Sequence, residues 1–117
     1  MTFVATKAPQ KARQFYEQIL GLTFISEDDF AIVFDANKTM LRVQKVQEHT
    51  PVNHTVLGWD VDDIYKEVKE LLERGVKCEQ YEWIKQDELG IWTAPSMAKI
   101  AWFKDPDENT LSFTQFP

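Results

Sequence analysis

Two histidines, His49 and His54, are the residues in this chain that first suggest metal or acid–base chemistry. A histidine builds a metal site only together with further histidines, cysteines or carboxylates. His54 opens an apolar segment of strand length without such partners beside it, and His49 lies in a polar stretch. We therefore interpret both as solvated or hydrogen-bonded side chains, with an unusual metal site around His54 as the alternative.

The other reactive side chains form no catalytic pattern. No glycine-rich phosphate loop, Ser-His-Asp arrangement or Cys-His pairing is present. Cys78 is the single cysteine, and we expect it to be a small, partly buried thiol. The acidic groups at residues 27–29 and 105–108 occupy turns, where carboxylates are normally solvated or cap backbone N–H groups. We assign these acidic groups to structure, and the sequence identifies no catalytic residue.

Aromatic side chains suggest instead that the chain binds a flat compound. The chain has four tryptophans, and an aromatic ring pair contributes about 0.5–1.5 kcal/mol beyond the area it buries. Strand alternation places Trp59 beneath a helix, which leaves Trp83, Trp92 and Trp102 as candidates. Alternation also puts Trp102 and Phe103 on opposite faces of one strand, and the sequence allows either order.

Alternation along neighbouring strands predicts the polar groups near such a compound. Arg42 shares a face with Gln44, and its guanidinium offers a hydrogen-bonding fork to an anionic or carbonyl group, with an exposed salt bridge as the equal alternative. Ser112 lies opposite the core-facing side of its strand, on the side that we assign to the ligand. The predicted ligand-binding residues are Arg42, Gln44, His54, Trp92, Trp102 and Ser112.

Composition and charge argue against several classes of protein. The 44% hydrophobic and 27% charged fractions are those of an ordinary globular protein. A net charge of −6 repels phosphate backbones and anionic lipid, so we expect neither nucleic-acid nor membrane-surface binding. The sequence shows no N-terminal apolar core of signal-peptide length and no stretch long enough to span a membrane, which favours a cytoplasmic protein.

The segments that must position these residues form two similar halves. The first half predicts a strand, a helix that begins at Pro9 and ends at Gly21, and three further strands. The second half predicts a strand, a helix capped by Asp62 or Asp63 and ended by Gly75, and three or four further strands. The predicted strands are residues 3–6, 22–26, 30–34, 39–46, 54–60, 77–81, 91–94, 99–103 and 110–115.

This pattern predicts an α+β fold in which two tandem βαβββ modules form curled mixed sheets around a cleft. We expect one domain over residues 1–117, with module 1 at about residues 1–48 and module 2 at about residues 53–117. The last two strands form a hairpin whose turn, residues 105–109, is fixed by Pro106 and by Asp and Asn side chains.

Four motifs in this order resemble the vicinal-oxygen-chelate superfamily, which includes glyoxalase I, extradiol dioxygenases, fosfomycin-resistance enzymes and bleomycin-resistance proteins. The motifs are residues 11–22 (KARQFYE followed by LGL at 20–22), 61–64 (VDDI), 90–93 (GIWT) and 102–109 (WFKDPDEN). The resemblance covers essentially the whole chain and implies paired βαβββ modules in a homodimer. One departure is Glu108, where the family usually has glycine, so we expect a strained residue there.

The resemblance also implies where a metal would bind in members that have one. Those members draw His and Glu ligands from four strands, and the matching positions here lie near Met1, at Arg42 or Gln44, at Val56 and at Ser112. None of these is a good metal ligand. We therefore expect no cofactor.

The sequence favours a metal-independent, homodimeric protein that binds a planar or aromatic small molecule, as bleomycin-resistance-type members do, and that catalyses no reaction. The alternative is a divalent-metal-dependent glyoxalase-, dioxygenase- or transferase-like enzyme with a non-standard ligand set around His54. An enzyme of this type would be a lyase or a dioxygenase. Catalysis without metal, through Arg42 or a tyrosine, is a third alternative.

Overall fold

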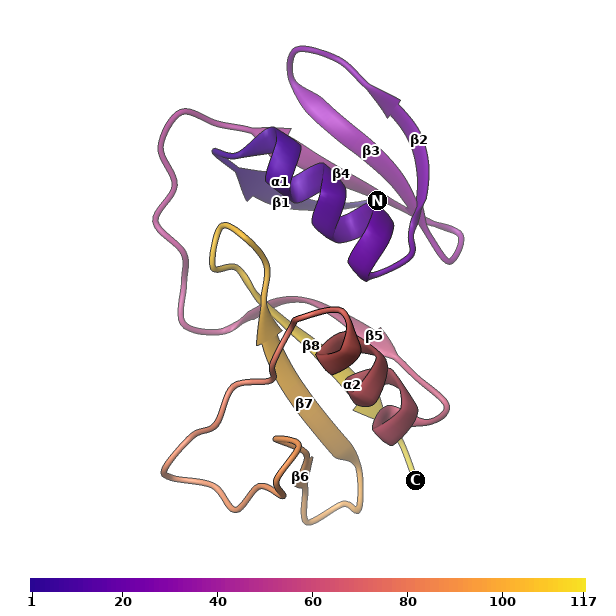
Figure 1. The fold of residues 1–117 in the computed structure, drawn as a ribbon, viewed down its shortest axis with the longest axis vertical. Coiled ribbons are helices and arrows are strands. Elements are labelled where there is room, and N and C mark those ends of the chain that lie inside the picture. The colour runs from indigo at the N-terminus through magenta and orange to yellow at the C-terminus, as the bar shows by residue number, and fades with distance from the viewer. The chain divides into compact units, whose positions relative to one another are not determined.

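The computed structural model describes all 117 residues, and they divide into two compact units (Figure 1). The first unit comprises Met1–Asn53 and Asp105–Asn109, and the second comprises His54–Lys104 and Thr110–Pro117. The turn at residues 105–109 belongs to the first unit, although it connects two strands of the second.

The first unit contains a four-stranded mixed sheet and one helical segment. The sheet has the order β1-β4-β3-β2, in which β1 is parallel to β4 and the other pairs are antiparallel. Its elements are β1 (Thr2–Thr6), α1 (Pro9–Gln14), η1 (Phe15–Ile19), β2 (Thr23–Glu27), β3 (Ala31–Ala36) and β4 (Thr39–Lys45).

The helical segment begins at Pro9, as predicted, and buries one apolar stripe against this sheet. Phe15 and Tyr16 are both buried, and the Tyr16 ring contacts the Phe34 ring of β3 at a centroid distance of 5.9 Å. From Phe15 onward the turns widen into the π-helix η1. The segment ends at Gly21, whose φ of +72° is a conformation that glycine adopts without steric cost.

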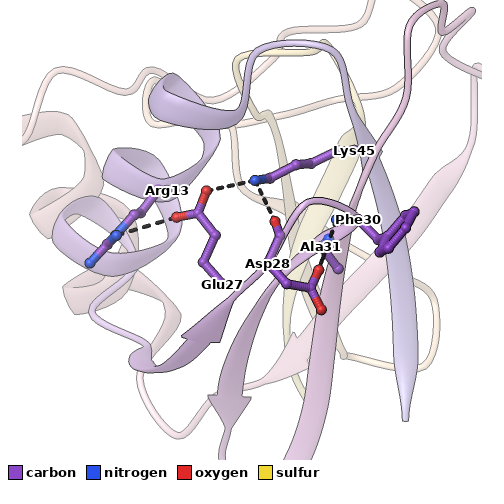
Figure 2. Close-up of polar contacts among 6 residues, drawn as sticks. All are labelled: Arg13, Glu27, Asp28, Phe30, Ala31 and Lys45. Atoms are coloured by element: carbon purple, nitrogen blue, oxygen red, sulfur yellow. Dashed lines mark hydrogen bonds and ion pairs between the residues drawn. The ribbon is translucent and has the colours of Figure 1, made fainter.

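A network of ionic contacts ties β2 to α1 and to β4 (Figure 2). Glu27 forms ion pairs with Lys45 at 2.8 Å and with Arg13 at 3.3 Å, and Lys45 also donates to the Asp28 carbonyl at 2.6 Å. The hydrogen bond from Lys45 is the main reason why the pKa of Glu27 lies below its ordinary value. All these side chains are partly exposed, so the network positions β2 more than it stabilises the fold.

The second unit repeats the architecture of the first. Its sheet has the order β5-β8-β7-β6, with β5 parallel to β8 and the other pairs antiparallel. Its elements are β5 (Thr55–Asp60), α2 (Ile64–Glu73), β6 (Trp92–Thr93), β7 (Lys99–Lys104) and β8 (Thr110–Gln115). The two mixed sheets and two helical segments confirm the predicted α+β class with tandem modules.

Helix α2 covers one face of the second sheet (Figure 1). Asp63 caps it by accepting a hydrogen bond from the Lys66 N–H, which is one of the two predicted caps. The buried side chains of α2 are Ile64, Val68 and Leu71. No helix in the structure has the length and apolar character needed to cross a membrane.

The predicted strand at residues 77–81 is absent. Only one backbone hydrogen bond of the kind that pairs strands is formed by Glu79, from its N–H to the Trp102 carbonyl. The Glu79 carbonyl and the Tyr81 N–H bind the side-chain amide of Gln86 instead of a neighbouring strand. Because a side chain takes these backbone partners, the segment between α2 and β6 forms an irregular loop.

The turn at residues 105–109 has the strain that the sequence predicts. Glu108 adopts a φ of +64°, a left-handed conformation that is uncommon outside glycine. Asp105 offsets this strain because its Oδ1 accepts hydrogen bonds from the Asp107 and Asn109 N–H groups, each at 2.9 Å. The Asp105 carboxylate therefore holds the backbone of the turn in this conformation.

Candidate ligand-binding site

The candidate site is the face of the second sheet that points away from α2. On β7 the buried side chains Ala101 and Phe103 point toward the helix, and the Lys99 amine lies 4.8 Å from the ring centre of Tyr65 on α2. By alternation Trp102 points to the opposite face. The structure thus decides the order of Trp102 and Phe103, because Phe103 is fully buried and Trp102 is only half-buried.

Sheet register brings Trp92 and Ser112 to the same face. Trp102 pairs with Ser112 on β8, which in turn pairs with Gly58 on β5, while Trp92 on β6 pairs with Ile100. A Cβ at Gly58 would approach the Ser112 hydroxyl to 2.8 Å. The glycine therefore leaves room for this hydroxyl.

Four aromatic rings gather on this face and form what we call the aromatic platform: Tyr81, Trp83, Trp92 and Trp102. The Trp92 and Trp102 rings are stacked, with centroids 6.0 Å apart and planes inclined by 29°. Tyr81 meets Trp102 edge-on at 5.7 Å and lies 4.7 Å from Trp83. Trp83 is 77% exposed, so one indole of the platform is almost entirely available to solvent.

Two polar side chains lie beside the platform. Ser112 is 7% exposed, and no buried side-chain N or O atom of the structure lacks a partner. Burial, with the nearby Glu79 carboxylate, raises the pKa of Tyr81 above its ordinary value, so the phenol stays protonated and can donate a hydrogen bond.

The sequence missed Tyr81 as a member of this site. The predicted strand at residues 77–81 placed it in a sheet, whereas the irregular loop turns its ring against Trp102. The available signal was the Tyr-Glu-Trp sequence at residues 81–83, which places two aromatic residues close together in the chain.

The other predicted residues lie elsewhere. Arg42 and Gln44 belong to the first unit, on the face of β4 opposite the buried Leu41 and Val43. Arg42 is half-buried and forms none of the ion pairs of the structure, so the salt bridge that was the alternative role for Arg42 is not formed. His54 is exposed, and its Nδ1 lies 3.1 Å from the carbonyl of Thr55.

The side chains present do not fit a divalent metal. No group of three His, Cys, Asp or Glu side chains lies close enough together to hold an ion. The His49 Nε2 lies 2.7 Å from the Asn109 Oδ1, which occupies that nitrogen. The positions near Met1 and at Arg42, Gln44, Val56 and Ser112 supply no imidazole or carboxylate.

Two hollows lie elsewhere on the surface. One, in the second unit, is small and apolar and includes Val68, Leu72 and Cys78. Burial raises the pKa of the Cys78 thiol to about 11, so this thiol is a poor nucleophile at neutral pH. The other lies beside the start of α1, where Glu27 and Lys45 already pair with each other.

The first unit contains a second concentration of polar side chains, which we call the polar cluster: Thr6, Tyr16, His49, Asp105, Asp107 and Asn109. Tyr16 donates to Asp105 at 2.7 Å, Thr6 donates to Asp107 at 2.5 Å, and Asn109 donates to the Ala5 carbonyl at 2.9 Å. Both carboxylates are 5% exposed. Because each of their oxygens already accepts a hydrogen bond, the cluster has a structural role.

Burial, followed by the proximity of Asp105, raises the pKa of Tyr16 well above its ordinary value. The phenol therefore stays a hydrogen-bond donor to Asp105 throughout the physiological pH range. From their place in a turn, the carboxylates at residues 105–108 are expected to be solvated or to cap backbone N–H groups. Asp105 does cap backbone, but both aspartates are buried rather than solvated.

Comparisons with known proteins agree with this architecture. An uncharacterised protein of Bacillus subtilis strain 168, YraH, is 28% identical over 118 residues, which cover 87% of this chain and 85% of that protein. The solved structure of a bleomycin resistance determinant encoded on the transposon Tn5 has a TM-score of 0.77, with 16% identity over 98% of this chain and 94% of that one.

A lactoylglutathione lyase from Agrobacterium tumefaciens has a TM-score of 0.74, with 14% identity over 98% of this chain and 92% of that one. At such identities these structures show a shared fold. The sequence model of the Glyoxalase/Bleomycin resistance protein/Dioxygenase superfamily matches residues 1–113. The chain therefore belongs to this superfamily.

Proposed function

We propose that this protein captures a planar or aromatic small molecule, without a metal ion, on the aromatic platform of its second unit. The observation that carries the proposal is the stacked pair Trp92 and Trp102 on a sheet face that no helix of that unit covers. Large indole rings left half-exposed on a sheet are typical of sites where a flat ligand completes the packing.

The polar groups of this face give a bound compound its orientation. Ser112 pairs with Trp102 across the sheet, and the Tyr81 ring, whose phenol stays protonated, meets the same indole edge-on. A flat compound that stacks on Trp102 therefore lies near two side-chain hydroxyls. This arrangement favours ligands that carry hydrogen-bonding groups on the ring edge.

Membership of the superfamily is compatible with both binding proteins and enzymes. The donor groups favour binding, because the chain supplies no cluster of metal-ligating side chains and no nucleophile with a lowered pKa. The likeness to the Tn5 bleomycin resistance determinant supports the same class of function. As part of the proposal the protein acts as a homodimer, which sedimentation at micromolar concentration tests.

The proposal is tested by titrating the protein, in the presence of a metal chelator, with flat two-ring and three-ring compounds. The signal is tryptophan fluorescence, and calorimetry gives the stoichiometry. We expect at least one compound to quench the fluorescence saturably with one binding site per chain. If no flat compound binds, or if each one binds without any change in the tryptophan signal, the proposal is wrong.

A further inference from the structure

We infer that Gln86 is the positioning residue of the aromatic platform, a role that rests on the platform being the ligand site. Its side-chain amide makes three hydrogen bonds to backbone groups of one loop. The Nε2 group donates to the Glu79 carbonyl at 2.9 Å and to the Gly90 carbonyl at 2.7 Å, and the Oε1 atom accepts from the Tyr81 N–H at 2.7 Å.

These three bonds close the loop between its two ends. Glu79 and Tyr81 lie in the first half of the loop, and Gly90 lies near its end, directly before Ile91 and β6. Gln86 also forms an isolated antiparallel bridge with Trp92. One side chain thus fixes both the segment that carries Tyr81 and the segment that carries Trp92.

The consequence for the platform follows from where these segments hold their rings. The Glu79 N–H is bonded to the Trp102 carbonyl at 2.8 Å, so the start of the loop is aligned along β7. With Gln86 in place, Tyr81 stands edge-on to Trp102 at 76° while Trp92 lies nearly parallel to it at 29°. Without the amide, nothing else bonds the Tyr81 N–H to the rest of the loop.

The conformation and packing of Gly90 also favour the closed arrangement of the loop around Gln86. Gly90 has a φ of +92°, and a Cβ there would lie 3.0 Å from the Cβ of Cys78 and 3.4 Å from the Glu79 carbonyl. The glycine lets its own carbonyl approach Gln86 closely while the loop passes against Cys78. The tight passage and the amide bonds therefore act on the same pair of segments.

Three single variants test this role. Gln86→Met keeps the length of the side chain but removes all three hydrogen bonds. Gln86→Glu keeps an acceptor for the Tyr81 N–H but replaces the amide donors by a carboxylate that faces two carbonyls. Gln80→Met is the matched control, because Gln80 is an exposed amide of the same loop whose single bond, to the Asp87 carbonyl, is 3.4 Å long.

The first readout is circular dichroism of the protein without ligand, in which stacked indole rings give a coupled signal. We expect Gln86→Met to lose about half of this signal or more, while the unfolding transition stays cooperative. The same variant should bind a flat compound about 10-fold more weakly, the amount by which a ring pair that contributes about 1.4 kcal/mol changes an equilibrium. Gln80→Met should change neither readout.

The second readout is the pH profile of Gln86→Glu. A protonated carboxyl donates one hydrogen bond, so the coupled signal should return as the pH falls through the pKa of the introduced group and should be lost above it. Glu79 and Asp87 are the nearby carboxylates, and they oppose ionisation of this group. The wild-type amide does not titrate, so the coupled signal of the wild type should stay constant between about pH 5 and pH 8. A variant that had only lost structure would not regain the signal at low pH.

The inference is overturned if Gln86→Met keeps both the coupled signal and the affinity of the wild type, or if Gln86→Glu shows no pH dependence that the wild type lacks. A lost signal with unchanged ligand affinity has a different meaning. It would support the positioning role of Gln86 and contradict the proposed function, because the ligand would then bind away from the platform.

Discussion

The polar cluster of the first unit and the aromatic platform of the second differ in how their polar groups are satisfied. In the cluster Asp105 and Asp107 are buried, and every carboxylate oxygen accepts at least one hydrogen bond. On the platform Trp83 is 77% exposed, and the Tyr81 phenol keeps a proton to donate. A saturated polar network holds a fold together, whereas rings open to solvent have contacts left to make.

The largest effect on stability should come from Asp105→Asn in the polar cluster. The new amide N–H₂ would face the Asn109 Nδ2 donor, which now bonds to the carboxylate at 2.8 Å. We expect the free energy of unfolding to fall by about 3 kcal/mol, measured by chemical denaturation, because a charged acceptor of buried donors is lost. Asp62→Asn, at an exposed aspartate, is the control and should change it by less than about 0.5 kcal/mol.

A loss of less than about 1 kcal/mol in Asp105→Asn would contradict the structural role of the cluster. The polar cluster would then behave like an exposed surface site and not like a buried network.

The largest effect on binding should come from Trp102→Ala, since Trp102 contacts both Trp92 and Tyr81. We expect the affinity for a flat ligand to fall about 10-fold or more, measured by calorimetry. Trp59→Phe is the matched control, because Trp59 contacts Phe113 and lies on the helix-covered face of the same sheet. Equal affinities for the wild type and Trp102→Ala would remove the platform from the site.

A smaller effect on stability is expected for Tyr16→Phe, which removes one hydrogen bond to Asp105. The free energy of unfolding should fall by about 1–2 kcal/mol at pH 7. Because the pKa of Tyr16 is raised in the folded protein, its contribution to the free energy of unfolding is complete below the ordinary tyrosine pKa near 10. This contribution is lost as the pH rises further. Tyr16→Phe should therefore lose less stability than the wild type above about pH 10. An identical alkaline loss in both proteins would contradict this assignment.

The smallest effect is expected for Glu27→Gln in the network of Figure 2. The pKa of Glu27 is lowered, chiefly by Lys45, so its stabilising contribution is present above the unfolded pKa and is lost as the pH falls through the folded one. Since the side chains are partly exposed, the free energy of unfolding of the variant should fall by no more than about 0.5 kcal/mol at pH 7. It should also decrease less steeply than that of the wild type as the pH is lowered, which chemical denaturation at several pH values measures. A loss above about 2 kcal/mol would show that this surface network matters as much as the buried cluster.

The sequence predicted the fold well because its periodicities are local. Pro9, Asp63, Gly21 and Gly75 mark helix ends by backbone chemistry that does not depend on distant residues. Strand β8 forms over Thr110–Gln115 as predicted from alternation. The failure at residues 77–81 has a non-local cause, because Gln86 takes the backbone partners of Glu79 and Tyr81.

The candidate site divides in the same way. Ser112 was predictable because strand parity assigns it to the face opposite the core. Trp92 and Trp102 were candidates by residue type, but parity left the order of Trp102 and Phe103 open until the burial of Phe103 decided it. Tyr81 and Gln86 were missed, since an irregular loop follows no period and places them by hydrogen bonds between side chain and backbone. The burial of Asp105 and Asp107 was missed for a related reason: their partners, Tyr16 and Thr6, are about a hundred residues away in the sequence.

The measurement that tests the central claim most directly is the affinity of one flat ligand with and without metal. The ligand is titrated calorimetrically into protein dialysed against a chelator, and into protein reconstituted with iron, manganese, nickel or zinc whose metal content is measured by elemental analysis. We predict the same affinity in every preparation and no stoichiometric metal after dialysis. Retention of about one metal ion per chain, with ligand binding only to the metal-loaded protein, would contradict the account and establish a metal-dependent site.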